Sequence, residues 1–472
     1  MKLLFLHIPH WTGVDSATPR VSAGMLRTAS AAIEQGFEVR LENLYLRWLS
    51  GKSTDVSEIL DSRVDCVAVS LHWSLQLAQT DRVVNDLLRS GRKVVVGGLT
   101  ASCFLDDLNR RFPGATVFPG DGEGLGWLGL QRSRRSLIPA DLVDQIEAET
   151  EKAVGFWSRS NFGSTRVLVP GAGCLRHCTM CGAPSTGSWW LSVRTVIARM
   201  EFDRNRGVNH HYICCDPDPG IYYFEQLLQA LVERRWPGTV SLSIYDPLSD
   251  VVIDLVSRLP SVGVVELSPD SADSRVRCLT KNTSTVSEIQ VYEQAIERLL
   301  MCGAEVQVYC SYFLPGDSII TVKRTAEWLW ELGVKYGARI SSYYLPSTTD
   351  PGSAAFQAPT QFGLIPLQRR YDQLVELVRL YEQAKSIANP LTSLPSGICA
   401  SEAWRLAATI ELHEFNRRSQ QHGRDCLGPR TFAESWALAS EMASEIVSQA
   451  SYVRITAKCE KSLRWQYAWS RM

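Results

Sequence analysis

Three cysteines with close spacing stand out as residues that could do chemistry. Cys174, Cys178 and Cys181 lie in the segment GAGCLRHCTMCGAP, residues 171–184, directly after the apolar run TRVLVP. Thiolates are soft ligands suited to zinc or to iron–sulfur clusters. The flanking glycines allow the backbone to wrap closely around a bound group and to direct N–H groups at its sulfurs. The sequence therefore predicts a metal centre in a loop at the tip of a strand.

The number of cysteines bears on the kind of metal. A structural zinc site usually has four ligands, often supplied as paired C-x2-C units, and no second pair of that kind occurs in the chain. His177 is a candidate fourth ligand, but its place inside the tight loop gives poor geometry. Three protein ligands would leave one iron of a cluster open to an exogenous ligand. We therefore favour an iron–sulfur cluster, with a zinc loop or unligated thiols as alternatives.

The whole chain has the composition of a cytoplasmic protein. Its 472 residues suffice for two to four domains, and a net charge of −1 argues against bulk binding to nucleic acid or to an anionic membrane. No apolar run approaches the roughly 18 residues of a transmembrane helix. The opening MKLLFLHIPHWTG lacks the features of a signal peptide and is typical of a core strand. Thirteen cysteines without an export signal predict reduced thiols rather than a disulfide framework.

Residues 1–130 alternate strand and helix patterns, which predicts a Rossmann-like, doubly wound parallel sheet. Strands are expected over 2–9, 37–45, 65–73, 93–98 and 115–124, and helices over 23–36 and 79–91. Ligands of such sheets bind at the carboxyl ends of the strands. Residues 131–165 are charged, lack strand character and are interpreted as a connector with one helix.

A second series of strands and helices occupies residues 166–365 and predicts a partial (β/α)6 barrel. Its strands are expected over 165–170, 210–217, 239–245, 262–269, 305–316 and 338–346. Residues 366–472 show amphipathic helical patterns and no clear strands, so they are predicted to form a helical C-terminal domain. Glu411 and Glu414 in this region are interpreted as part of a solvated charged face, with a cation-binding pair as the alternative.

The cysteine spacing, placed after the first strand of a β/α series, resembles that of the radical S-adenosylmethionine (SAM) superfamily, over roughly residues 166–352. The resemblance implies a [4Fe–4S] cluster on the three cysteines, whose open iron chelates SAM. It also implies reductive cleavage of SAM to a 5′-deoxyadenosyl radical, with an electron from a flavodoxin- or ferredoxin-type donor.

The same resemblance implies SAM contacts at the ends of later strands. Asp216 would accept a hydrogen bond from the SAM ammonium, although a turn or helix cap is the alternative for this residue. Met180 takes a place that is often aromatic in the family and would pack near the adenine. Arg277 or Lys281 would lie near SAM or substrate. The remaining implied contacts are Ser268 or Asp270 at the ribose and Pro315 and Gly316 beside the adenine.

A Rossmann-like domain before such a barrel resembles the cobalamin-binding subfamily. The implied cobalamin-binding residues are His72, Trp73, Gly97, Gly98, Gly120 and Gly122. The glycines would allow close approach of the backbone to the cobalamin tail. The D-x-H-x-x-G motif that supplies a cobalt ligand is absent, so no lower ligand is assigned. An ordinary strand end packed on a helix is the alternative for His72 and Trp73.

The resemblance implies a cobalamin-dependent radical SAM C-methyltransferase, acting on a small-molecule or peptide intermediate of a natural-product pathway. The cofactors would carry the chemistry, which agrees with the lack of a visible catalytic dyad or triad. One alternative is a radical SAM dehydratase, dehydrogenase or rearrangement enzyme whose first domain no longer binds cobalamin. Another is a non-catalytic iron–sulfur protein.

Overall fold

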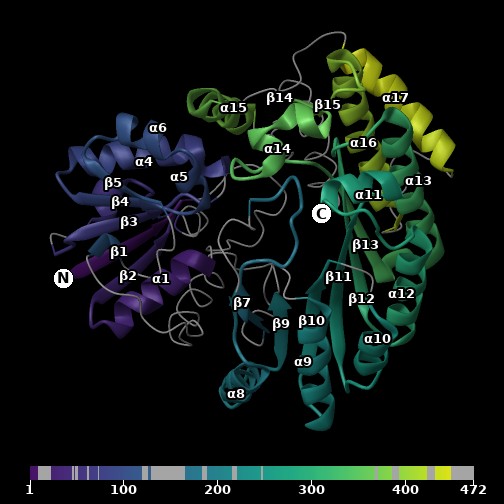
Figure 1. Cartoon of the computed structure of the whole chain (residues 1–472), viewed down its shortest axis with the longest axis horizontal. Helices are drawn as coiled ribbons and strands as arrows, with labels where there is room; N and C mark the ends of the chain where they lie inside the picture. Colours follow the sequence, from purple (N-terminus) through teal and green to yellow (C-terminus); the bar gives the residue numbers. More distant parts are fainter. Residues whose placement is uncertain are drawn as a thin grey trace.

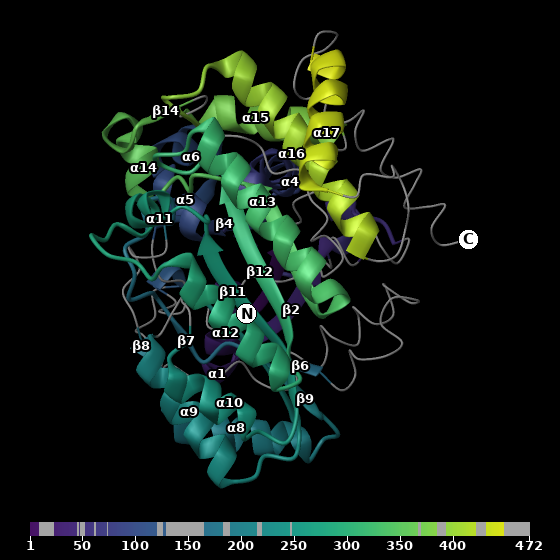
Figure 2. The same ribbon diagram turned by 90° about the vertical axis from the view of Figure 1, so that its right-hand side faces the viewer.

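Two parallel sheets and a set of C-terminal helices make up the molecule (Figures 1 and 2). The structure is a computed structural model that describes residues 1–8, 23–44, 47, 52–60, 63–72, 74–119, 126–128, 165–182, 189–214, 220–245, 248–366, 370–384, 393–421 and 431–447. The predicted connector 131–165 therefore lies outside the described residues, apart from Thr165. Among the described helices, none is long and apolar enough to cross a membrane.

The N-terminal sheet has five parallel strands in the order β2-β1-β3-β4-β5. Its strands are β1 (Lys2–His7), β2 (Glu38–Asn43), β3 (Cys66–Ser70), β4 (Lys93–Gly97) and β5 (Ala115–Phe118). This order confirms the predicted doubly wound sheet. The strand order reverses between β1 and β3, and the carboxyl ends at such a reversal are where open α/β sheets bind ligands.

Both faces of this sheet are buried, as continuous apolar strands require. Leu3 and Phe5 of β1 pack against α1 (Ala23–Glu34), whereas Leu4 and Leu6 face the opposite core. That opposite core contains residues of α3 (Val56–Ile59), α4 (Leu77–Arg89), α5 (Leu99–Cys103) and α6 (Leu105–Arg111).

The second sheet has six parallel strands in the order β13-β12-β11-β10-β9-β6, as predicted for the partial barrel. The strands are β6 (Thr165–Leu168), β9 (His210–Cys214), β10 (Thr239–Ile244), β11 (Val262–Asp270), β12 (Glu305–Tyr312) and β13 (Ile340–Pro346). The helices are α8 (Val193–Arg204), α9 (Ile221–Glu233), α10 (Asp250–Ser257), α11 (Ser274–Lys281), α12 (Ile289–Met301) and α13 (Ile319–Tyr336).

The helices bury one face of the six-stranded sheet. Alternate strand residues such as Val265, Val308 and Ile340 join the helices in one large hydrophobic core. The other face is turned toward the N-terminal domain (Figure 1). Because side chains of a strand alternate between its two faces, the residues between these apolar positions line the inner side of the partial barrel.

The C-terminal helices pack on both halves of the molecule. Tyr371 and Leu374 of α15 (Tyr371–Ala384) belong to the hydrophobic core of the N-terminal domain. In contrast, Leu406 and Ile410 of α16 (Ala400–Gln421) belong to the barrel core, and α17 (Phe432–Val447) packs on α16. The three described helices agree with the predicted helical patterns.

Two predictions for this region are wrong. The region does contain strand structure, because β15 (Ser393–Pro395) pairs antiparallel with β14 (Leu364–Pro366); three residues are too few for an alternating pattern to show. Glu414 is also not on a solvated face. It is buried against Arg417, whose Nη2 lies 2.7 Å from the Glu414 carboxylate.

Candidate active site at the cysteine loop

The three cysteines lie in the loop that follows β7 (Gly171–Ala172), which pairs with β8 (Trp189–Trp190) in a short hairpin. All three cysteines are outside any disulfide, and all three are half-buried. The backbone N–H of Arg176 donates to Cys174 Sγ at 3.4 Å, the kind of contact that stabilises a ligating sulfur. Gly171 has no space for a Cβ because the Trp190 ring covers it. The glycine at this position is therefore needed for local packing, in addition to the close approach of backbone N–H groups to the sulfurs of a bound group.

Backbone hydrogen bonds fix this loop between two other segments. Thr179 N–H donates to the Thr280 carbonyl at 2.8 Å, next to the C-terminal end of α11, and the Thr179 carbonyl accepts from Ala355 N–H at 2.9 Å. Asp350 anchors the end of the loop, since its carboxylate accepts from Gly182 N–H at 3.1 Å. The loop that would carry the metal is therefore held by residues from both β11–α11 and the segment after β13.

Met180 fills the position predicted to pack near the adenine. Its side chain is buried in a small apolar cluster with Val276, Leu314 and Leu364. Leu314 precedes the predicted adenine residues Pro315 and Gly316, so the structure brings these sequence positions together around one cluster. The Cβ that any residue other than glycine would place at 316 would collide with Leu279 of α11, and Gly316 has a φ of +82°. The turn thus packs directly on α11.

Ser268 and Asp270 lie at the carboxyl end of β11 beside the cysteine loop. Asp270 Oδ2 is 2.8 Å from Lys281 Nζ, which also donates to the Ser268 carbonyl at 3.3 Å. Burial raises the pKa of the Cys178 thiol, and the Lys281 ammonium opposes that rise. Asp270 has a φ of +67° and follows a shift in the β11–β12 register. The direction of its carboxylate is therefore set by a left-handed backbone conformation that is uncommon for residues other than glycine.

Of the two cations predicted near SAM or substrate, Lys281 is the one that acts on Cys178 of the cysteine loop. Arg277 is 1% exposed and donates to the carbonyls of Ser271 and Ser287 at 2.7 and 2.8 Å. These contacts identify Arg277 as a residue that holds the loops around α11 together. Lys281 lies at the C-terminal end of the same helix, where a cation is also favoured by the helix dipole.

A cluster and a single metal ion make different demands on the three thiols. Among the described residues, no group of three or more His, Cys, Asp or Glu side chains converges closely enough to hold one ion. A mononuclear zinc site needs that convergence because its four ligands lie about 2.3 Å from the same atom. In an iron–sulfur cubane each thiolate binds a different iron, so the thiolates stand further apart. Three soft donors, a nearby cation and backbone N–H groups fit such a group.

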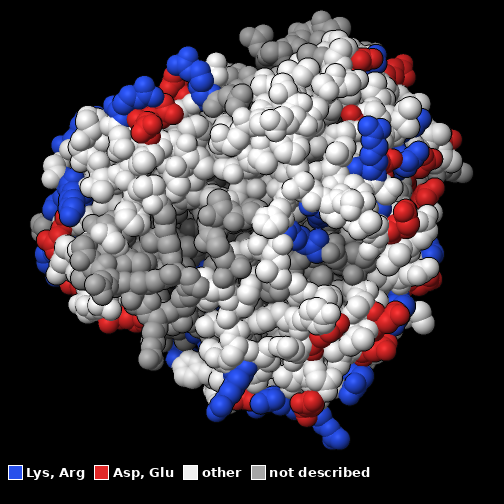
Figure 3. Space-filling model, in the orientation of Figure 1, with Lys and Arg blue, Asp and Glu red and all other residues white. Residues whose placement is uncertain are grey.

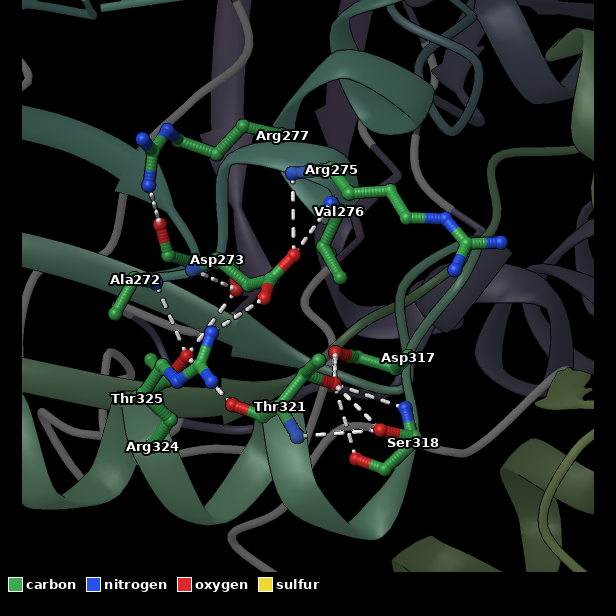
Figure 4. Close-up of polar contacts among 11 residues, drawn as sticks. Ala272, Asp273, Arg275, Val276, Arg277, Asp317, Ser318, Thr321, Arg324 and Thr325 are labelled. Carbon is green, nitrogen blue, oxygen red and sulfur yellow. Dashed lines mark hydrogen bonds and ion pairs between the residues drawn. The ribbon is translucent and has the colours of Figure 1, made fainter. Parts of the chain in front are cut away.

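Asp317, directly after the Pro315–Gly316 turn, is a buried carboxyl group with its own pH dependence. Its oxygens accept from Leu314 N–H and from Thr321 Oγ1, each at 2.8 Å, and Figure 4 shows the contact with Thr321. Burial raises the pKa of Asp317 to about 7, and the two hydrogen bonds oppose that rise. The neighbouring Asp273 carboxylate accepts from the first N–H groups of α11 and pairs with Arg324 at 2.8 Å.

The raised pKa of Asp317 predicts that the free energy of unfolding falls as the pH rises over a defined range. Because the pKa is higher in the folded state than in the unfolded state, the folded state binds the proton more tightly. The stabilisation of the folded state by this proton is therefore complete below about pH 4. It is lost as the pH rises to about 7, by about 1.4 kcal/mol per pH unit in between. Urea unfolding of wild type and Asp317→Asn at pH 5, 6 and 8 should show wild type losing stability relative to the variant along that slope up to about pH 7, with little further loss above it. A pH-independent difference would contradict the assignment.

The N-terminal domain meets the cysteine loop directly. A Cβ at Gly182, one residue after Cys181, would lie 3.4 Å from the side chain of Leu99 in α5. Arg27 of α1 donates to the Gly171 carbonyl and lies 4.9 Å from the centre of the Trp189 ring. Figure 3, drawn in the orientation of Figure 1, shows a hollow on the face turned to the viewer, with basic side chains in it. The carboxyl end of the first sheet and that of the second thus share one region.

The described residues predicted to bind cobalamin stand at the carboxyl ends of β3 and β4. His72 is half-buried, and its carbonyl accepts from Thr100 Oγ1 at 2.8 Å. Gly98 has a φ of +119°, and a Cβ there would lie 2.5 Å from the Leu71 carbonyl oxygen, so the fold itself requires this glycine. Gly97 has no such constraint. Trp73, Gly120, Gly122 and the predicted SAM ligand Asp216 lie outside the described residues.

Sequence reasoning missed Arg27 and Asp350, the two side chains that fix the ends of the β7–loop segment. An arginine inside an amphipathic helix and an aspartate in a Pro-Gly turn carry no signal of a distant partner. Their contacts depend on residues 144 and 168 positions away in the chain.

Comparison with known proteins agrees with this geometry. Residues 168–329 match the family model of the radical SAM superfamily. Among solved structures, TsrM from Kitasatospora setae, a radical SAM methyltransferase with tryptophan substrate and a SAM analogue bound, has a TM-score of 0.61 at 14% identity, covering 99% of each chain. OxsB, a cobalamin-dependent SAM radical enzyme, has a TM-score of 0.56 at 12% identity, covering 94% of this chain and 71% of OxsB. No match was found among curated protein sequences.

Residues 168–329 therefore match a radical SAM domain. The two sheets and the C-terminal helices together have the fold of the solved structures of TsrM and OxsB.

Proposed function

We propose that this protein is a cobalamin-dependent radical SAM methyltransferase that acts on carbon. The observation that carries the proposal is the contact between α5, at the carboxyl end of the N-terminal sheet, and the cysteine loop of the barrel. A cofactor at the end of the first sheet would thereby lie next to one at the end of the second. The structural neighbours TsrM and OxsB, solved with cobalamin or SAM, support this layout.

The residues of the chain would hold and shield the cofactors. Cys174, Cys178 and Cys181 would bind a [4Fe–4S] cluster, and the apolar cluster around Met180 would support the adenine of SAM. Asp270, aimed by its positive φ, would accept from the ribose hydroxyls. When bound, the cluster, SAM and cobalamin supply the deoxyadenosyl radical and the methyl group for the reaction. The protein supplies position and exclusion of water.

Two products of SAM separate this proposal from its alternative. Methyl donation converts SAM to S-adenosylhomocysteine, whereas reductive cleavage yields 5′-deoxyadenosine. Protein reconstituted with iron and sulfide should form 5′-deoxyadenosine with dithionite, and should form S-adenosylhomocysteine only after hydroxocobalamin is added. Formation of 5′-deoxyadenosine alone, with or without hydroxocobalamin, would contradict methyl transfer and favour a dehydratase, dehydrogenase or rearrangement enzyme.

Adjacent glycines provide a matched test of the cobalamin site. Gly97→Ala should change the free energy of unfolding by less than about 1 kcal/mol, because the nearest atom to its new Cβ is 3.9 Å away. It should nevertheless lower the cobalt retained per chain if corrinoid approaches this backbone. Gly98→Ala should destabilise the fold by about 2 kcal/mol or more, because of its positive φ and the Leu71 contact. Urea unfolding and cobalt quantification measure both effects, and full cobalt retention by Gly97→Ala would remove Gly97 from the site.

A further inference from the structure

The inner face of the partial barrel carries a row of polar side chains. The register aligns Cys214 with Ser243, Ser243 with Glu266, Glu266 with Gln307 and Gln307 with Ser341, across five neighbouring strands. Their chain neighbours Ile213, Leu242, Leu267 and Val308 point into the helix-covered core. A barrel interior that only packs is filled mostly by branched apolar residues. The polar row therefore indicates an interior that binds something polar.

Glu266 is the charged member of this row and is half-buried. The Tyr212 hydroxyl of β9 donates to its carboxylate, and burial raises the pKa of Tyr212, so this phenol keeps its proton and remains a neutral donor. Within the described part of the chain, no Lys or Arg forms an ion pair with Glu266, whereas Asp270, four residues later, pairs with Lys281. A half-buried carboxylate that has no cationic partner among the described residues is suited to bind a cationic ligand.

Two stacked tyrosines lie in the next row toward the carboxyl ends of the strands. Tyr309 of β12 and Tyr343 of β13 are register partners, with ring centroids 4.7 Å apart and planes at 10° to each other. The Arg418 guanidinium of α16 lies over Tyr343, 5.3 Å from its centroid. Tyr309 also donates from its hydroxyl to Gln307 Oε1 at 3.1 Å, which ties the aromatic row to the polar row. Rings fixed in this way offer a flat surface to a planar ligand.

The place of this group along the barrel fits a substrate rather than SAM. Glu266 precedes Asp270 by four residues on β11, which corresponds to roughly 13 Å along a strand. Asp270 is at the end of the strand, where it meets Lys281 beside the cysteine loop. A molecule at Glu266 would therefore lie deeper in the barrel than one bound beside the cysteines.

We propose that the inner barrel face formed by Glu266, Tyr212, Tyr309 and Tyr343 binds a substrate with an aromatic ring and a cationic amine, the amine on Glu266 and the ring against the tyrosines. This inference rests on the proposed function, because it assigns the substrate class of the same active site. Glu266 is a binding residue in this scheme, and no covalent step is assigned to it.

The test uses two indole probes of opposite charge on protein reconstituted with iron and sulfide. Tryptamine carries an ammonium group and indole-3-propionate a carboxylate on similar rings. Isothermal titration should show tryptamine binding at least tenfold more tightly than indole-3-propionate, as expected for a charge-assisted contact. Equal affinities, tighter indole-3-propionate or undetectable tryptamine binding would overturn the proposal. The comparison requires no variant and so does not depend on whether a variant folds.

Substitutions then test which side chains produce the difference in affinity between the two probes. Glu266→Gln should weaken tryptamine at least tenfold and leave indole-3-propionate no weaker than before, and Tyr309→Leu should weaken both probes. Glu305→Gln is the matched control, because this carboxylate is exposed at the start of neighbouring β12, and it should change neither affinity. An unchanged tryptamine affinity in Glu266→Gln would overturn the proposal.

Failure of the inference and failure of the proposed function give different results. Protein that cleaves SAM and retains cobalt, yet shows no preference for tryptamine, would reject the substrate class alone. Protein that prefers tryptamine through Glu266, yet retains no cobalt and forms no S-adenosylhomocysteine, would reject methyl transfer and keep the amine site.

Discussion

Replacing Cys174, Cys178 or Cys181 with Ala should remove most of the protein-bound iron and reduce the formation of 5′-deoxyadenosine to background. Each thiolate is expected to bind a different iron of one cluster, so the loss of one leaves the cluster incompletely held. The hydrogen bonds from Thr179 and Gly182 to other segments do not involve the thiols, so the fold should survive. Iron quantification and product analysis after anaerobic reconstitution measure the two effects.

Cys399→Ala is the control for these variants. Cys399 is an exposed free thiol before α16, and its loss should leave both the iron content and SAM cleavage unchanged. Full iron retention in all three loop variants would show that the cysteine loop is not the cluster site. Equal loss in Cys399→Ala would indicate nonspecific iron binding by thiols.

Replacing Arg417 with Met should cost about 3–5 kcal/mol of the free energy of unfolding, because it leaves the Glu414 carboxylate buried without its partner. The two side chains are 2% and 5% exposed. Arg417 also donates to the Ser342 hydroxyl and carbonyl, both at 2.6 Å, which binds α16 to β13. Burial alone would raise the pKa of Glu414, but Arg417 holds that pKa below its ordinary value. Urea unfolding at pH 7 measures the cost.

A second i,i+3 pair of the same two residue types provides the comparison. Arg379 and Glu376 are 2.8 Å apart, close to the 2.7 Å of the buried pair, but both are about half exposed. Arg379→Met should therefore cost no more than about 0.5 kcal/mol. The cost of Arg417→Met should also begin to shrink above pH 4.5 as the pH falls, because burial raises the pKa of Glu414 above its ordinary value once Arg417 is gone. Equal costs for the two arginine variants would contradict the burial argument.

The two sheets follow from local patterns in the sequence. Short apolar runs such as residues 2–9 and 93–98 could only be buried on both faces, and the helical segments between them require parallel crossovers. Gly36, predicted to end the first helix, has a φ of +81° just after α1. Residues 262–269, predicted as a strand, form most of β11, in which buried and half-buried residues alternate from Val264 onward.

Contacts that decide the environment of a charged residue lie beyond such patterns. The sequence spacing of Glu411 and Glu414 indicates one helix face but gives no information on the Ser342 carbonyl, which binds Arg417 from another element. Arg277 and Lys281 are likewise four positions apart on one helix, yet one is tied to backbone carbonyls and the other to Asp270. Tertiary packing, rather than residue type, separates their roles.

The cysteine loop was accessible from spacing alone, but its neighbours were not. Met180, Pro315 and Gly316 follow from the resemblance, and the structure places Leu314 and Met180 in one apolar cluster. The contact of α5 with this loop is set by the docking of two domains that are far apart in the chain. The roles of Gly97, His72 and the other predicted cobalamin residues stay predictions.

The content of iron and cobalt per chain tests the central claim most directly. Protein reconstituted anaerobically with iron, sulfide and hydroxocobalamin, then freed of unbound cofactor, should contain about four irons and about one cobalt per chain, with the absorption of both an iron–sulfur cluster and a corrinoid. About four irons without cobalt would contradict cobalamin dependence. Iron at or below one per chain would contradict the radical SAM assignment of the cysteine loop itself.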